Sequence, residues 1–102
     1  MIFSTEPAHI VFPVDELVIR KQVLSYLSEY FMADEDLVDE TFLIDDLGAD
    51  SLDLLQVVYT LNEMFIIQIE PDDLPRMLFV GGVCDLVIEL VKKSDGYLAS
   101  PV

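Results

Sequence analysis

The apolar surface of the strongest predicted helix, residues 51–65, restricts the fold of this chain more than any other feature. At about 100° per residue, its polar positions fall on one narrow side and its apolar positions cover an arc of roughly 220°. A helix at the surface of a globular protein usually has an apolar stripe of little more than ~100°. We therefore expect this helix to face more than one neighbour. The apolar positions are Leu52, Leu54, Leu55, Val57, Val58, Tyr59, Leu61 and Phe65.

The rest of the chain also shows helical spacing. Apolar residues recur three and four positions apart over 14–32 and over 80–93, and Gly96 can end the second of these helices. Pro71 begins a short helix, and a long connection over 33–49 alternates acids with apolar residues and should pack down. With no convincing pair of strands, the sequence predicts an all-α bundle of three major helices and one short helix with a long first loop.

The length of 102 residues suits a single domain. We expect an irregular N-terminal arm over 1–13, a helical domain over 14–93 and a C-terminal tail over 94–102. The first residues lack the basic region and continuous apolar core of a signal peptide, and no apolar run reaches the ~20 residues that span a bilayer. The expected location is cytoplasmic.

The charge balance narrows the choice of partners. Twenty acids against five bases give a formal net charge of −15. Such a chain repels nucleic-acid phosphates and anionic membrane surfaces, so neither is an expected partner. Basic protein surfaces are the natural partners, with fast and salt-sensitive association. We expect a monomer.

Few residues offer catalytic or metal chemistry. The single cysteine, Cys84, has no disulfide partner and lies on an apolar helix, which is typical of a small core residue. The acids do not follow calcium-loop spacing, because Val38 and Asp39 stand where a ligand and a glycine are needed. The one histidine, His9, lies in the arm. No histidine is therefore near Ser51, the serine at the start of the 51–65 helix, to activate it as a nucleophile. We therefore predict no metal site and no enzyme activity.

Residues 45–55, DDLGADSLDLL, contain the most informative local pattern. On position alone, Ser51 would be the N-cap of the helix that follows. Asp50 is an equally good cap, and Asp53 three residues later makes a weak capping box. Ser51 would then be the first helical residue, with its hydroxyl pointing outward after a permissive turn at Gly48. A phosphate attached there would lie at the positive end of the helix.

The motif LGADSLD at 47–53 resembles the attachment motif of the acyl carrier proteins and related peptidyl and aryl carrier domains. The resemblance runs from about Leu37 to Val91, through FLIDDLGADSLD, LNEMF at 61–65, IEPDDL and VGGVCDLV, in the expected order. It implies an acyl-carrier-protein-like bundle in which Ser51 carries 4′-phosphopantetheine, taken from coenzyme A, through a phosphodiester. It also implies a carrier that holds acyl intermediates as thioesters for fatty acid or specialised lipid biosynthesis.

The resemblance further implies which residues surround the carried group. The partners would be a phosphopantetheinyl transferase and acyl-transfer or condensing enzymes with basic docking patches. They would meet the second helix at Asp50, Leu52, Asp53, Gln56, Tyr59 and Glu63. The candidates for an acyl pocket between the second and third helices are Leu55, Val58, Leu61, Phe65 and Ile69.

Several features depart from the usual pattern of the family and favour a specialised carrier. Gln56 stands where an acid is common and Tyr59 where a methionine is common, and Gly81 and Gly82 weaken the first turn of the last helix. Fatty acyl, hydroxy-fatty acyl, polyketide and aminoacyl cargo all remain open. The alternative from another class is an unmodified acidic helical adaptor, whose wide apolar arc binds another protein.

Overall fold

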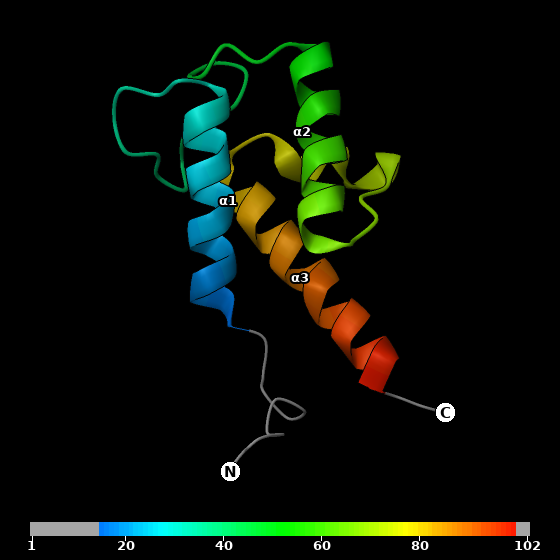
Figure 1. Ribbon diagram of the computed structural model, residues 1–102. Coiled ribbons are helices and arrows are strands. Elements are labelled where there is room, and N and C mark those ends of the chain that lie inside the picture. Colours follow the sequence, from blue (N-terminus) through cyan, green and yellow to red (C-terminus); the bar gives the residue numbers. More distant parts are fainter. Residues whose placement is uncertain (1–14, 100–102) are drawn as a thin grey trace.

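The computed structural model describes residues 15–99, with side chains to residue 94, so the predicted arm over 1–13 lies outside the described residues. Two long helices stand side by side and antiparallel, and a third runs obliquely across them (Figure 1). In the described residues the only β pairing is an isolated bridge between Phe42 and Phe79. The predicted all-α bundle is therefore confirmed. The helices are α1 (Glu16–Tyr30), α2 (Ser51–Phe65), the 3-10 helix η2 (Pro71–Met77) and α3 (Val80–Ala99).

Helix α1 begins where its sequence supplies a cap. The Asp15 carboxylate accepts hydrogen bonds from the backbone N–H groups of Leu17 and Val18, at 3.2 and 3.3 Å. These donors have no partner within the helix, so an N-cap side chain satisfies them. The buried residues of α1 recur every four positions and give it one inward face. They are Ile19, Val23 and Leu27.

Helix α3 is longer than the sequence indicated. The predicted end lay near Lys93, with Gly96 as the terminator, but the helix continues to Ala99 and includes Gly96. A glycine inside a helix costs about 1 kcal/mol relative to alanine. That cost is too small to end a helix by itself.

The glycine pair at the start of α3 allows two close approaches of other segments. A Cβ atom on Gly82 would lie 1.9 Å from the carbonyl oxygen of Arg76, and one on Gly81 would lie 2.9 Å from the Cβ of Asp39. The N–H of Gly81 also donates to the carbonyl of Asp39 at 2.9 Å. The prediction that this pair only weakens the helix was therefore incomplete, because η2 and the first loop pack where side chains would stand.

The long first loop packs onto the bundle, as the sequence predicted. Leu43 is fully buried, and its N–H donates to the carbonyl of Leu78 at 3.0 Å. The N–H of Ala49 donates to the carbonyl of Leu43 at 2.9 Å, and the rings of Phe42 and Phe79 meet edge to face with centroids 6.0 Å apart. The loop thus contributes to the same core as α1, α2 and α3.

Three of the five basic residues form ion pairs within the bundle. Arg20 reaches Asp39 at 3.0 Å and Asp85 at 2.9 Å, so it joins α1, the first loop and α3. Arg76 pairs with a glutamate of α3, and Lys92 pairs with a glutamate at the start of α1. Because most of the basic residues form ion pairs within the chain, the negative charge of the other acidic residues is largely left without a positive partner.

Candidate functional site

Ser51 is the first residue of α2, and its side chain is exposed. The cap is Asp50, whose carboxylate accepts a hydrogen bond from the N–H of Asp53 at 2.9 Å. The Asp53 carboxylate in turn accepts one from the N–H of Asp50 at 3.1 Å, which completes a capping box. The prediction that Asp50 caps the helix is confirmed. The Ser51 hydroxyl is consequently not used as a helix cap.

The turn before Ser51 needs a glycine. Gly48 has φ +75°, a left-handed conformation that residues with a Cβ rarely adopt, and nothing lies within 4 Å of the place where its Cβ would be. Its N–H donates to the carbonyl of Ile44 at 3.1 Å, and the next residue, Ala49, is buried. The chain therefore passes from the core to the exposed Ser51 within two residues.

A contact with α1, which sequence reasoning missed, holds the start of α2. The hydroxyl of Tyr30 donates to the Asp53 carboxylate at 2.8 Å. The pKa of Asp53 is lowered, first by the backbone N–H of Asp50 and then by this hydroxyl, and the pKa of Tyr30 is raised because its proton is held by Asp53. Helical spacing had placed Tyr26 and Tyr30 on one face of α1. It gave no sign of a partner on a helix 23 residues away.

The chemistry open to Ser51 follows from its surroundings. Among the described residues no side chain makes a hydrogen bond with its hydroxyl. The N–H groups of the first helical turn have no partner within a helix, and the helix dipole adds partial positive charge there. The start of α2 can thus accept a phosphate-bearing group, and within the described residues no side chain is hydrogen-bonded to the hydroxyl in the way a general base would be.

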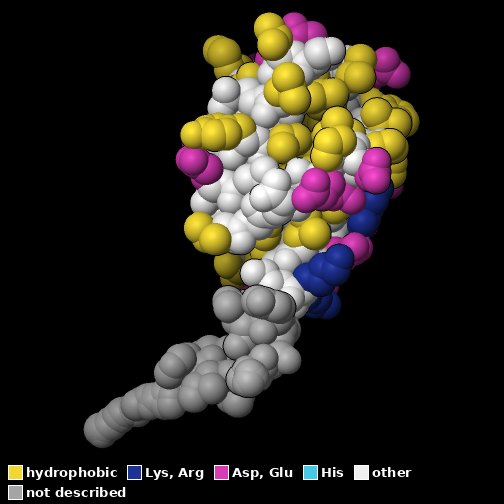
Figure 2. Space-filling view, turned by 90° about the vertical axis from the view of Figure 1, so that its right-hand side faces the viewer, with side chains coloured by type: hydrophobic (Ala, Val, Ile, Leu, Met, Phe, Trp, Pro, Cys, Tyr) yellow, Lys and Arg dark blue, Asp and Glu magenta, His cyan; other side chains and the backbone are white. Residues whose placement is uncertain are grey.

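The candidate partner residues all lie on α2 or at its cap. Leu52 and Tyr59 are 75% and 60% exposed. The Gln56 amide donates to the hydroxyl of Thr60 at 3.0 Å, and the neighbouring Glu63 carboxylate raises the pKa of Tyr59. Figure 2 shows hydrophobic side chains over the upper part of the face turned toward the viewer, with acids among them and Lys and Arg at the lower right edge.

The five pocket candidates lie at different depths. Leu61 and Ile69 are buried, Val58 and Phe65 are partly buried, and Leu55 is 59% exposed. The arc that gave α2 its wide apolar surface is thus divided between a buried side and an exposed side. A shallow cavity of about 470 Å³ lies near the C-terminal end of α2. Its lining is Asn62, Ile66, Ile67, Gln68, Leu90 and Ser94.

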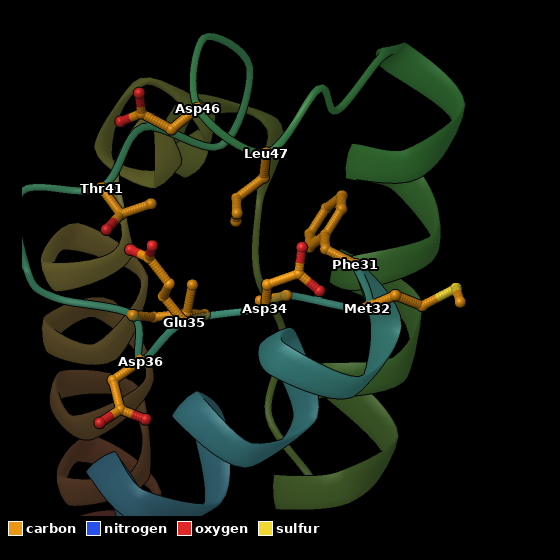
Figure 3. Close-up of a pocket in the computed structure, with 10 residues that line it drawn as sticks. Phe31, Met32, Asp34, Glu35, Asp36, Thr41, Asp46 and Leu47 are labelled. Carbon is orange, nitrogen blue, oxygen red and sulfur yellow. The ribbon is translucent and has the colours of Figure 1, made fainter.

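Another cavity lies between the end of α1 and the first loop and is rich in acids. Figure 3 shows Asp36 and Asp46 pointing away from each other, with Asp34 beside Phe31 and Glu35 directed toward Thr41. In the part of the chain that the structure describes, no group of three or more Asp, Glu, His or Cys side chains could hold a metal ion.

Cys84 occupies the core position expected from its sequence context. Its side chain is fully buried, and burial raises the pKa of the thiol to about 11. Such a thiol is inert as a nucleophile near neutral pH.

Over the described residues, no helix has both the length and the apolar character needed to cross a membrane.

The fold is a small helical domain with an exposed serine at the first position of its second long helix, and comparison with known proteins identifies the family. Residues 21–77 match the family model described as a phosphopantetheine attachment site. The chain is 41% identical to an acyl carrier protein of Thermotoga maritima over 76 residues, which are 74% of this chain and 90% of that protein.

Two further relatives agree. An acyl carrier protein of Desulforapulum autotrophicum is 40% identical over 61 residues, 60% of this chain and 74% of the relative. One of Campylobacter lari is 36% identical over 75 residues, 72% of this chain and 92% of the relative. The chain belongs to the acyl carrier protein family, as LGADSLD predicted. Members of this family carry acyl groups and are not catalysts, which confirms the expectation that the chain is not an enzyme.

Proposed function

We propose that the hydroxyl oxygen of Ser51 is the attachment point for 4′-phosphopantetheine, transferred from coenzyme A by a phosphopantetheinyl transferase. One observation carries the proposal: Ser51 is exposed at the first position of α2, while Asp50 performs the capping for which a serine would otherwise be used. Its hydroxyl is free for esterification, and modification would leave the capping box intact.

The residues around Ser51 fit a phosphodiester. The N–H groups of Ser51 and Leu52 are at the positive end of α2 and can donate to phosphate oxygens. Asp50 and Asp53 oppose an anion, but their carboxylates already accept backbone hydrogen bonds, and that of Asp53 also accepts from Tyr30. These hydrogen bonds offset part of the negative charge of the two carboxylates.

When bound, the prosthetic group supplies a thiol that holds acyl groups as thioesters, whose carbonyls are better electrophiles than those of oxygen esters. The protein's own residues position this group and identify the carrier to successive enzymes. We place the chain in fatty acid or specialised lipid biosynthesis. The carrier domain would span residues 14–93 and act as a cytoplasmic monomer.

The docking surface would run along α2 from its cap at Asp50 to Glu63 in its last turn. Leu52 and Tyr59 offer apolar contact, and Asp50, Asp53 and Glu63 offer negative charge to basic patches on acyl-transfer and condensing enzymes. Association should be fast and should weaken as salt is added, because exposed charges are screened.

The test is intact mass after incubation with coenzyme A and a broad-specificity phosphopantetheinyl transferase. We expect a single phosphopantetheine on the wild type and none on Ser51→Ala. Thr60→Ala is a matched control, because it removes a hydroxyl from the same helix at a distance from the site. Modification of Ser51→Ala, or none of the wild type with several transferases, would refute the assignment.

The second candidate is an unmodified adaptor, and the exposed apolar residues of α2 favour it. Leu52, Leu55 and Tyr59 are each more than half exposed. An adaptor would bind its partner equally well as wild type and as Ser51→Ala, whereas replacing Leu55 by a charged residue would weaken binding. A carrier would lose its covalent adduct in Ser51→Ala.

A further inference from the structure

We propose that the exposed aromatic pair Phe42 and Phe79 is a second docking surface, separate from α2, which binds an arginine-bearing segment of a partner protein. The two rings meet edge to face with centroids 6.0 Å apart, and they are 46% and 40% exposed. Ile44 and Leu78, within two residues of the pair, are nearly half exposed as well. These four residues form the aromatic patch, and exposed apolar residues that gather in this way mark interaction sites.

The backbone holds both rings outward. Leu43, next to Phe42 in the first loop, is fully buried. Val80, next to Phe79 at the start of α3, is also fully buried, and its N–H donates to the carbonyl of Thr41 at 2.9 Å. A partner would thus meet rings that are already fixed, and rigid aromatic side chains lose little conformational entropy on binding.

A purely structural role does not require this exposure. Backbone hydrogen bonds from the N–H groups of Leu43, Val80 and Gly81 already join the first loop to the start of α3 and the residues before it. Two rings buried in the core would stabilise this junction more than two rings that leave nearly half of their surface in water. The exposed ring surface is accounted for by a partner.

Charge decides which kind of partner fits the aromatic patch. Glu40 and Asp45 flank Phe42 in the chain, are exposed, and form no ion pair within the described residues. A guanidinium can pair with such carboxylates and also stack on an aromatic ring, which an ammonium does less well. A second copy of this chain, a nucleic acid or an anionic membrane would instead bring more negative charge to a chain whose net charge is −15.

The aromatic patch lies beside the turn that leads to Ser51. The carbonyls of Leu43 and Ile44 accept hydrogen bonds from the N–H groups of Ala49 and Gly48, at 2.9 and 3.1 Å. A partner can therefore contact the patch and approach Ser51 without covering the exposed side of α2. Binding at the patch requires no group on Ser51, so its failure and the failure of the proposed modification are distinguishable.

The test uses the isotope-labelled full chain and a synthetic peptide in which arginine alternates with leucine. We expect saturable shifts of the backbone amide signals of residues 41–46 and 78–81 that exceed the shifts along α2. The same peptide with lysine in place of each arginine should bind about two- to fivefold more weakly, which is the ratio that an exposed cation–π contact gives.

Two variants and a control separate the rings from the charges. Phe79→Ser should weaken binding of the arginine peptide and remove its advantage over the lysine peptide. Asp45→Asn leaves both rings in place, and it should weaken binding and make it less sensitive to salt. Leu17→Ser is the matched control, because it removes an exposed apolar residue from α1, and it should bind as the wild type does. Circular dichroism verifies that each variant is folded.

Several outcomes would overturn the inference. They are equal binding of the two peptides, amide shifts that follow α2 instead of the aromatic patch, and unchanged binding by Phe79→Ser or by Asp45→Asn. Sedimentation of the chain alone as a dimer that Phe79→Ser abolishes would also overturn it, because a second copy of the chain would then occupy the patch.

Discussion

Replacement of Gly82 by alanine sets two effects of opposite sign against each other. Alanine favours a helix over glycine by at most about 1 kcal/mol, so sequence alone predicts a gain in stability. In the structure, the new Cβ would lie 1.9 Å from the carbonyl oxygen of Arg76, more than an ångström inside any ordinary contact. This oxygen belongs to the backbone of η2 and cannot rotate away, so α3 and η2 must separate.

Overpacking of this kind costs roughly 1–3 kcal/mol, and a backbone obstacle places it in the upper part of that range. After the helical gain is subtracted, we expect a loss of about 1–2 kcal/mol, or a fall in Tm of about 5–15 °C. The adjacent Gly81→Ala is the matched control. Its Cβ would lie 2.9 Å from the Cβ of Asp39, on a loop that can yield slightly.

The assay is thermal unfolding followed by far-ultraviolet circular dichroism, with urea unfolding to give the free energy of unfolding. Gly81→Ala should change Tm by less than about 4 °C, because the helical gain offsets a small displacement. If Gly82→Ala melts at or above the wild type, or no lower than Gly81→Ala, then η2 does not pack against α3 as closely as described and the reasoning fails.

Three further measurements test the electrostatics and the core. Because self-repulsion at a net charge of −15 opposes folding, added salt or Mg²⁺ should raise Tm, and an unchanged Tm would count against that account. Cys84 should resist alkylation at neutral pH until denaturant is added, since its pKa of about 11 and its burial both protect it; rapid labelling of the folded chain would contradict this. The folded-state pKa of Asp53 is lowered, so its contribution is complete above its unfolded pKa of about 3.9 and is lost as pH falls through the folded value. The Tm advantage of the wild type over Tyr30→Phe should therefore shrink below about pH 4, and an advantage that grows there would show that Tyr30 acts through something other than the carboxylate.

The sequence predicted local features well because they depend on neighbours in the chain. The cap at Asp50, the start of α2 at Ser51 and the short helix after Pro71 follow from residues within a few positions of each other. Packing of the first loop was also foreseen, because its apolar residues needed a core. Leu43 is the clearest example.

The features that were missed depend on contacts between distant segments. Helical spacing does not indicate that the hydroxyl of Tyr30 donates a hydrogen bond to Asp53. It also does not indicate that the backbone of Arg76 packs where a side chain at Gly82 would stand. The end of α3 was misjudged because a glycine was read as a terminator when its cost is small beside the rest of the helix. The wide apolar arc of α2 predicted several neighbours, yet Leu55 remains exposed.

Because the first loop is anchored to the bundle, the start of α2 is held in a fixed position. Leu43 and Ala49 are buried and hydrogen-bonded to each other, and Tyr30 clamps the first turn of α2 from the other side. The attachment point of a group carried on Ser51 is thus held in place and does not move independently of the bundle. Its reach would be set by the length of its own arm and by the tumbling of the whole domain. Enzymes that share this carrier would then have to bind close to a rigid attachment point. The order in which they bind would be decided by how they contact the acidic face of the carrier.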